Sequence, residues 1–243
     1  MTCAAILPFV RRGRCLTLRH RFARWLLDGR VALQRGRWRW SHPSEDRVKR
    51  AFDIAFSAVV LLLLTPVFAV IAVLIKLEDG GPLLFRQVRV GRHGREFRML
   101  KFRSMRPDAE DRLRELLAQN HHKAGVTFKL KDDPRITRVG RWLRKFSLDE
   151  LPQFYNVLRG DMSVVGPRPP VPREVQLYTL ADRRRLAVQP GITCLWQISG
   201  RAHIDFHGQV ELDVRYIENR SFWRDLVIIT KTLPAVLSGT GAY

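Results

Sequence analysis

Two adjacent carboxylates, Asp149 and Glu150, are the residues of this sequence whose types and spacing best suit catalysis. They lie in the segment SLDELPQ (147–153), where we expect a helix to begin. The dipole of a helix favours the ionised form of a carboxylate in its first turn. An ionised aspartate can attack phosphorus to form an aspartyl-phosphate, and a neighbouring carboxylate can bind a hard divalent cation. The same spacing also fits a capping box between Ser147 and Glu150, so both interpretations stay open.

Three cations could bind the phosphate groups of a substrate. Lys101 and Arg103 alternate along an expected strand and therefore share one face, which suits a diphosphate. A solvated strand face explains that pair equally well. Arg168 stands in the turn Gly166-Pro167-Arg168-Pro169, where the prolines restrict the backbone on both sides. A guanidinium fixed in this way is useful for binding phosphate.

Composition narrows the possible partners. Lys and Arg number 43 against 23 Asp and Glu, a net charge of +20. Such an excess indicates an anionic partner: nucleic acid, a phosphorylated substrate or an anionic membrane surface. Hydrophobic residues make up 46% of the chain, which excludes global disorder. The sequence has no P-loop, GxGxxG or HExxH motif, which excludes a Walker-type nucleotide hydrolase and a helical zinc protease.

One long apolar segment is expected to enter a membrane. The 22 residues from Ile54 to Ile75 contain no charge, and a straight helix of that length would span the hydrocarbon core. Basic residues flank both ends, which by the positive-inside rule places both ends in the cytoplasm. We therefore predict a re-entrant hairpin over 48–77 that breaks at Thr65-Pro66, with the Thr65 hydroxyl satisfying a freed backbone group. The alternative is a single-pass helix with a proline kink.

The remaining sequence predicts a basic arm and a mixed domain. Residues 1–47 hold eleven arginines and three acids, typical of either an interfacial helix or a disordered arm. Residues 78–243 form the expected catalytic domain, an α/β (mixed α+β) fold with a small sheet. A basic amphipathic helix over 136–146 would suit a surface of anionic lipid. The other expected elements are strands over 83–90 and 96–105 and helices over 108–119, 149–158, 206–219 and 222–237, the last interrupted by Pro234.

Five segments occur together in a fixed order between residues 48 and 243. They are RAFDIAFSAVVLLLLTP, GPLLFRQVRVGRHGREFRMLKFRSM, LDELPQFYNVLRGDMSVVGPRP, PGITCLWQISGR and DVRYIENRSFWRDLVIITKT. In these segments the chain resembles the bacterial sugar transferase family. These are small monotopic phosphoglycosyl transferases, also called polyprenyl-phosphate hexose-1-phosphate transferases.

The resemblance implies an activity and a role for each candidate residue. Such enzymes transfer a hexose-1-phosphate from a UDP-sugar to undecaprenyl phosphate and release UMP, which initiates exopolysaccharide, capsule or O-antigen assembly. Glucose or galactose is the first expectation for the sugar. By the same resemblance Asp149 is the nucleophile, Glu150 helps to bind Mg²⁺, and Lys101, Arg103 and Arg168 bind substrate phosphates. We add Arg201, at the end of PGITCLWQISGR, to the predicted phosphate-binding residues.

The expected location is the cytoplasmic face of the bacterial inner membrane, with anionic lipid as a further partner and no nucleic acid. Two non-catalytic alternatives remain: a basic membrane-anchored protein that binds nucleic acid, and an inactive scaffold for polysaccharide assembly. The intact set of Asp149, Glu150, Lys101 and Arg168 argues against a scaffold.

Overall fold

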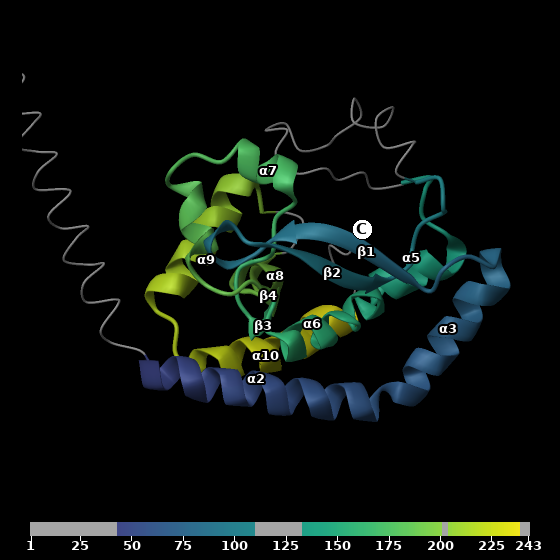
Figure 1. Cartoon of the computed structure of the whole chain (residues 1–243), viewed down its shortest axis with the longest axis horizontal. Helices are drawn as coiled ribbons and strands as arrows, with labels where there is room; N and C mark the ends of the chain where they lie inside the picture. The colour runs from purple at the N-terminus through teal and green to yellow at the C-terminus, as the bar shows by residue number, and fades with distance from the viewer. Residues whose placement is uncertain (1–42, 110–132, 201–203, 239–243) are drawn as a thin grey trace, which may run out of the picture. The chain divides into compact units, whose positions relative to one another are not determined.

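The computed structural model describes residues 43–109, 133–200 and 204–238. These residues form helices around two small sheets (Figure 1), which confirms a mixed α/β fold. The residues from Val48 onward belong to one compact unit. Most of the predicted basic arm (1–47) and most of the predicted helix over 108–119 lie outside the described residues.

The apolar segment forms two helices with a bend between them. Helix α2 (Pro43–Leu63) and helix α3 (Thr65–Asp79) meet at Leu64 at an angle of 59°. Pro66 lies in the first turn of α3, where its missing N–H costs no helix bond. The Thr65 hydroxyl donates to the Leu61 carbonyl at 2.9 Å. The structure thus confirms a break beside Thr65-Pro66. No helix within the described ranges could cross a membrane on its own, although the bent pair together has the necessary length and composition.

Two sheets of two strands each form beside these helices. Strand β1 (Leu84–Val90) pairs antiparallel with β2 (Glu96–Phe102), as the alternation of the sequence predicts. A short 3₁₀ turn, Arg92–Gly94, connects the two strands. Strand β3 (Ser163–Val165) pairs in parallel with β4 (Gly191–Thr193).

Six more helices complete the described part of the chain. The predicted helix at 136–146 is α5, in which the Thr137 hydroxyl accepts a hydrogen bond from the Gly140 N–H. The predicted interruption at Pro234 is wrong, because α10 continues through that residue. A proline removes only one hydrogen bond, and neighbouring bonds persist, among them the Thr232 hydroxyl to the Ile228 carbonyl at 2.7 Å. The helices are α5 (Arg138–Lys145), α6 (Gln153–Arg159), α7 (Pro172–Gln176), α8 (Leu195–Ser199), α9 (Phe206–Glu218) and α10 (Phe222–Ser238).

An apolar core joins α3, the second helix of the bent pair, to the mixed domain. Ile71 and Ile75 of α3 pack against Phe102 of β2 and Leu143 of α5, and all four side chains are buried. Phe68 adds an edge-to-face contact with Phe102, with 5.3 Å between the ring centroids. Burial of this apolar surface holds α3 against the domain.

The first helix of the bent pair, α2, is held by polar as well as aromatic contacts. The Arg50 guanidinium donates to the carbonyls of Val157 and Leu158, at 2.6 and 2.9 Å, and so satisfies the C-terminal end of α6. Lys49 pairs with Asp225 of α10. Figure 1 shows α2 running alongside α6 and α10. The helix therefore has one face against protein, and its position relative to α6 is fixed.

We predict that Leu143→Ala lowers the free energy of unfolding by about 2–5 kcal/mol, because it leaves a cavity in the core between α3, β2 and α5. Leu143 is 0% exposed, whereas its neighbour Trp142 is 54% exposed. Trp142→Ala is the matched control and should cost much less. Denaturant titrations of both variants in detergent would measure the difference, and equal losses would contradict the packing described here.

Candidate active site

The two candidate carboxylates lie in a tight turn between α5 and α6. Asp149 and Glu150 belong to a 3₁₀ turn, Leu148–Glu150, and α6 begins only at Gln153, so the single helix predicted over 149–158 is wrong. Ser147 has a left-handed backbone (φ 53°) and its side chain makes no capping bond. The capping-box interpretation is therefore also wrong, and Glu150 is available for other contacts.

A cation from β2 contacts both carboxylates. The Nζ of Lys101 lies 2.7 Å from Oε1 of Glu150 and 3.7 Å from Oδ2 of Asp149. Lys101 is 49 positions from Glu150 in the sequence, and the packing of β2 against the turn brings it to the two carboxylates. The cluster therefore brings two acidic side chains and one basic side chain together.

The surroundings give the two carboxylates opposite properties. Burial raises the pKa of Asp149, an effect that Lys101 and Arg144 oppose only in part. Burial would also raise the pKa of Glu150, but the charge of Lys101 and its hydrogen bond outweigh it and, with Arg168, lower that pKa. Environments that push the pKa values of two neighbouring acids apart indicate two different roles. Glu150 holds its negative charge firmly, while Asp149, 6% exposed, is the poorly solvated and more basic carboxylate.

The Pro-Arg-Pro turn is held in place by the end of β1. The buried Arg89 guanidinium donates to the Pro169 carbonyl at 2.8 Å, and the Val90 N–H donates to the Pro170 carbonyl at 2.9 Å. Burial and the nearby charge of Arg168 lower the pKa of Arg89 to about 9, so it stays protonated at neutral pH. The Arg168 side chain makes no hydrogen bond or ion pair with the other described residues, which leaves its guanidinium free for an anion.

Two predicted phosphate-binding residues are not part of this cluster. Arg103 is buried and pairs with Asp79 in the last turn of α3. It therefore joins α3 to the end of β2, and a contact with substrate stays a prediction. Arg201 lies outside the described residues.

Sequence reasoning missed Arg144 and Arg89. Arg144 lies in the Arg-rich helix α5, which the sequence assigns to a lipid surface, yet it is half-buried, its Nε donates to the Ser104 hydroxyl at 2.9 Å, and its charge acts on Asp149. Arg89 looks like one more cation of an exposed strand. In both cases the sequence pattern carries no signal, because only the tertiary packing distinguishes these arginines from their exposed neighbours.

The cluster has a limited capacity to bind metal. Within the described ranges, no group of three or more His, Cys, Asp or Glu residues could hold an ion. Mg²⁺, however, commonly takes one or two carboxylates together with waters and substrate phosphates. The firmly ionised Glu150, whose side chain is 28% exposed, fits such a partial ligand set.

Comparison with known proteins identifies the family. The model of the family described as bacterial sugar transferase matches residues 44–239, and the chain belongs to this family. It is 54% identical over 195 residues to the galactosyl transferase CpsE of Streptococcus agalactiae, covering 80% of this chain and 43% of that protein. It is 45% identical over 204 residues to the exopolysaccharide production protein ExoY of Rhizobium meliloti, covering 83% and 90%. It is also 45% identical over 199 residues to the undecaprenyl-phosphate galactose phosphotransferase of Salmonella typhimurium, covering 81% and 42%. The chain thus spans most of ExoY but less than half of the other two.

We predict that Lys101→Met lowers the free energy of unfolding at pH 7 by about 1–2 kcal/mol, because an ionised and partly buried Glu150 loses its hydrogen-bonding partner. A carboxyl whose pKa is lowered in the folded state contributes stability above its ordinary pKa of 4.5 and loses it as the pH falls through the folded value. The difference between wild type and variant should therefore shrink below pH 4.5.

Denaturation midpoints at neutral and acid pH would measure this effect. Arg98→Met, which removes an exposed cation from the same strand, is the matched control. A loss of stability for Lys101→Met that is the same at both pH values would contradict the proposed ion pair.

Proposed function

We propose that this protein transfers hexose-1-phosphate from a UDP-sugar to undecaprenyl phosphate and releases UMP. The observation that carries the proposal is the pair of adjacent carboxylates with opposite pKa shifts, Asp149 and Glu150, joined by Lys101 in a chain of the bacterial sugar transferase family. One relative is a galactosyl transferase and another a galactose phosphotransferase, so galactose comes before glucose as the proposed sugar. The product would be the first lipid-linked sugar of an exopolysaccharide, capsule or O-antigen.

In the first step, an Oδ atom of Asp149 attacks the phosphorus that carries the sugar. A bond forms between this oxygen and phosphorus, and the bond from phosphorus to the oxygen of UMP breaks, so UMP leaves with the electron pair. A buried carboxylate is poorly solvated and therefore more nucleophilic than an exposed one. Lys101 and Arg168 are the cations best situated to offset the charge of the diphosphate.

In the second step, a phosphate oxygen of undecaprenyl phosphate attacks the same phosphorus and the Asp149 carboxylate leaves. The two substrates thus react in turn, which predicts ping-pong kinetics. Glu150 is the residue that would hold Mg²⁺. When bound, this ion would neutralise charge on the diphosphate as UMP leaves.

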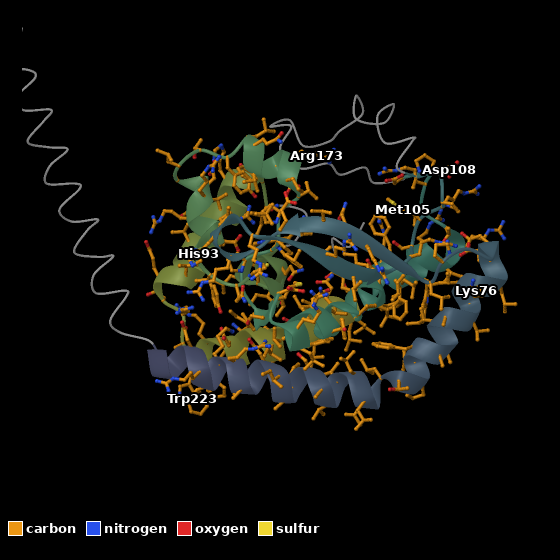
Figure 2. All side chains as sticks on the ribbon, in the orientation of Figure 1. Lys76, His93, Met105, Asp108, Arg173 and Trp223 are labelled. Carbon is orange, nitrogen blue, oxygen red and sulfur yellow. The ribbon has the colours of Figure 1, made fainter. Side chains whose placement is uncertain are left out.

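The membrane location rests on the outer face of the hairpin. Large apolar side chains of α2, α3 and α10 are exposed, and Figure 2 shows Trp223 of α10 at the outer side of α2. An exposed apolar surface of this extent indicates contact with lipid. With basic residues at both ends of the segment, we infer a re-entrant hairpin in the cytoplasmic leaflet of the bacterial inner membrane, against anionic lipid. The exposed apolar residues include Val59, Leu62, Leu63, Val70, Val73, Leu77, Trp223, Leu233 and Leu237.

We predict that the purified protein releases UMP from UDP-galactose or UDP-glucose over many turnovers only when undecaprenyl phosphate and Mg²⁺ are both supplied. Without undecaprenyl phosphate it should release at most one UMP per enzyme, because the covalent intermediate accumulates. Asp149→Asn should lower turnover by about a thousandfold or more while the protein stays folded, because a neutral amide is a poor nucleophile. UDP-sugar labelled in the sugar should leave label on wild-type protein but none on Asp149→Asn.

The control is Asp161→Asn, a change of the same kind at a carboxylate in the turn after α6. Chelation should abolish release of UMP, and added Mg²⁺ should restore it. Absence of UMP release for every UDP-sugar tested would instead favour the non-catalytic scaffold, and undiminished turnover by Asp149→Asn would exclude this residue as nucleophile.

We also predict that both ends of the hairpin face the cytoplasm. Single cysteines introduced by Arg47→Cys and Leu77→Cys, in a background without the native cysteines, should react with an impermeant thiol reagent only after spheroplasts are opened. Pro66→Ala should favour a straighter helix, because it restores the missing hydrogen-bond donor. Labelling of either site in intact spheroplasts would mean that the segment spans the membrane.

A further inference from the structure

On the edge of β2 that faces away from β1, a side chain makes the hydrogen bonds that a neighbouring strand would otherwise make. On the first edge β1 pairs with the odd-numbered residues, as in the bond from the Arg103 N–H to the Leu83 carbonyl at 2.9 Å. The backbone groups of the even-numbered residues therefore face the other edge. There Oδ1 of Asn156 accepts from the Leu100 N–H at 2.9 Å, and Nδ2 donates to the Arg98 carbonyl at 2.8 Å.

A peptide group of a neighbouring strand would offer β2 the same donor and acceptor. The Asn156 side chain is 1% exposed, so water cannot substitute for it at this edge. An unpaired N–H or carbonyl at such a buried site would be costly. The amide therefore fixes the position of β2 relative to α6 through two bonds at once.

The two segments that these bonds join, β2 and α6, both lie next to residues of the candidate site. On β2 the bonded Leu100 directly precedes Lys101, and on the other side α6 begins three residues after Glu150. A shift of β2 along α6 would therefore move the Lys101 ammonium away from the carboxylates of Asp149 and Glu150. We propose that Asn156 is a positioning residue, which sets the register of β2 so that Lys101 meets the two carboxylates. This inference rests on the proposed function only where its test uses turnover.

The helix that carries Asn156 is itself held in place. Gly160 ends α6 with a left-handed backbone (φ 89°), and Arg50 of α2 binds the carbonyls of Val157 and Leu158. Because its C-terminal end is fixed, α6 holds the Asn156 amide in place.

Only a side chain with one donor and one acceptor can replace the amide. Asn156→Leu keeps the size but makes neither bond. Asn156→Asp keeps the acceptor and regains the donor only when the introduced carboxyl is protonated. The titratable group in contact with the amide is Asp161, whose Oδ2 lies 3.3 Å from Nδ2 and which pairs with Arg159. Burial and this neighbouring carboxylate would raise the pKa of the introduced carboxyl toward the neutral range.

The first test compares kcat/KM for UMP release by Asn156→Leu, Asn156→Asp and the control Val157→Ala, a fully buried neighbour on the same helix. All assays are run well below the unfolding temperature of each variant. Asn156→Leu should lose about 10- to 100-fold, as expected for misplaced catalytic groups, and Val157→Ala much less. The activity of Asn156→Asp relative to wild type should rise as the pH falls from about 8 to about 6, as protonation restores the donor, while that of Asn156→Leu should stay flat.

The second test does not need turnover. Acetylation of Lys101 by a small anhydride, followed by mass spectrometry, should be slow in wild type and Val157→Ala and several-fold faster in Asn156→Leu. If wild type releases no UMP from any UDP-sugar, the proposed function fails and acetylation alone decides the role of Asn156. Unchanged reactivity of Lys101 in Asn156→Leu would overturn the inference, as would a loss of turnover no greater than that of Val157→Ala or a flat pH ratio for Asn156→Asp.

Discussion

The ammonium group of Lys101 lies against two adjacent carboxylates, and the arrangement of the mixed domain serves to hold it there. Without a cation, neighbouring and largely buried carboxylates would repel each other and one would take up a proton. Burial raises the pKa of Asp149 more than Lys101 lowers it, whereas the closer contact with Lys101 outweighs burial at Glu150 and lowers its pKa. Burial and one shared cation thus separate a group suited to attack from a group suited to cations.

Strand β2 connects this site to the bent pair of helices α2 and α3. Lys101 and Phe102 are neighbours on β2, and successive side chains of a strand point to opposite faces. Lys101 faces the two carboxylates, while Phe102 packs against Ile71 and Ile75 of α3. The strand is therefore held on one face by the core that packs against α3 and, on the edge away from β1, by Asn156. If the hairpin sits in lipid as proposed, the depth of the hairpin in the membrane also sets the depth of the reactive carboxylates.

The sequence predicted well what depends on local pattern and poorly what depends on packing. Alternation and turn residues located β1 and β2, and the proline with its basic flanks located the bend beside Thr65. The turn that carries Asp149 was predicted as an α-helix, because the spacing from Ser147 to Glu150 imitates a capping box and the left-handed backbone of Ser147 has no sequence signature. The contact of Lys101 with the two carboxylates joins segments far apart in the chain, so no local pattern could reveal it. The contact of the Asn156 amide with β2 could not be predicted either, because a single asparagine within a helix forms no recognisable sequence pattern.

The structure also changes how the positive charge of the chain is interpreted. A net charge of +20 counted from the sequence suggests a surface that attracts polyanions. Several of these arginines, however, are largely buried and used within the protein: Arg89 holds the Pro-Arg-Pro turn, Arg103 pairs with Asp79, and Arg185 pairs with Asp213 at 2.6 Å and lies over two neighbouring aromatic rings. Such groups keep their charge but present little of it to a large partner. Arg168 is different, because its charge acts on Glu150 while its side chain makes no hydrogen bond or ion pair with the other described residues. Part of the positive charge of this chain thus belongs to arginines that build the fold, and Arg168 is a cation that stays available to a phosphorylated ligand.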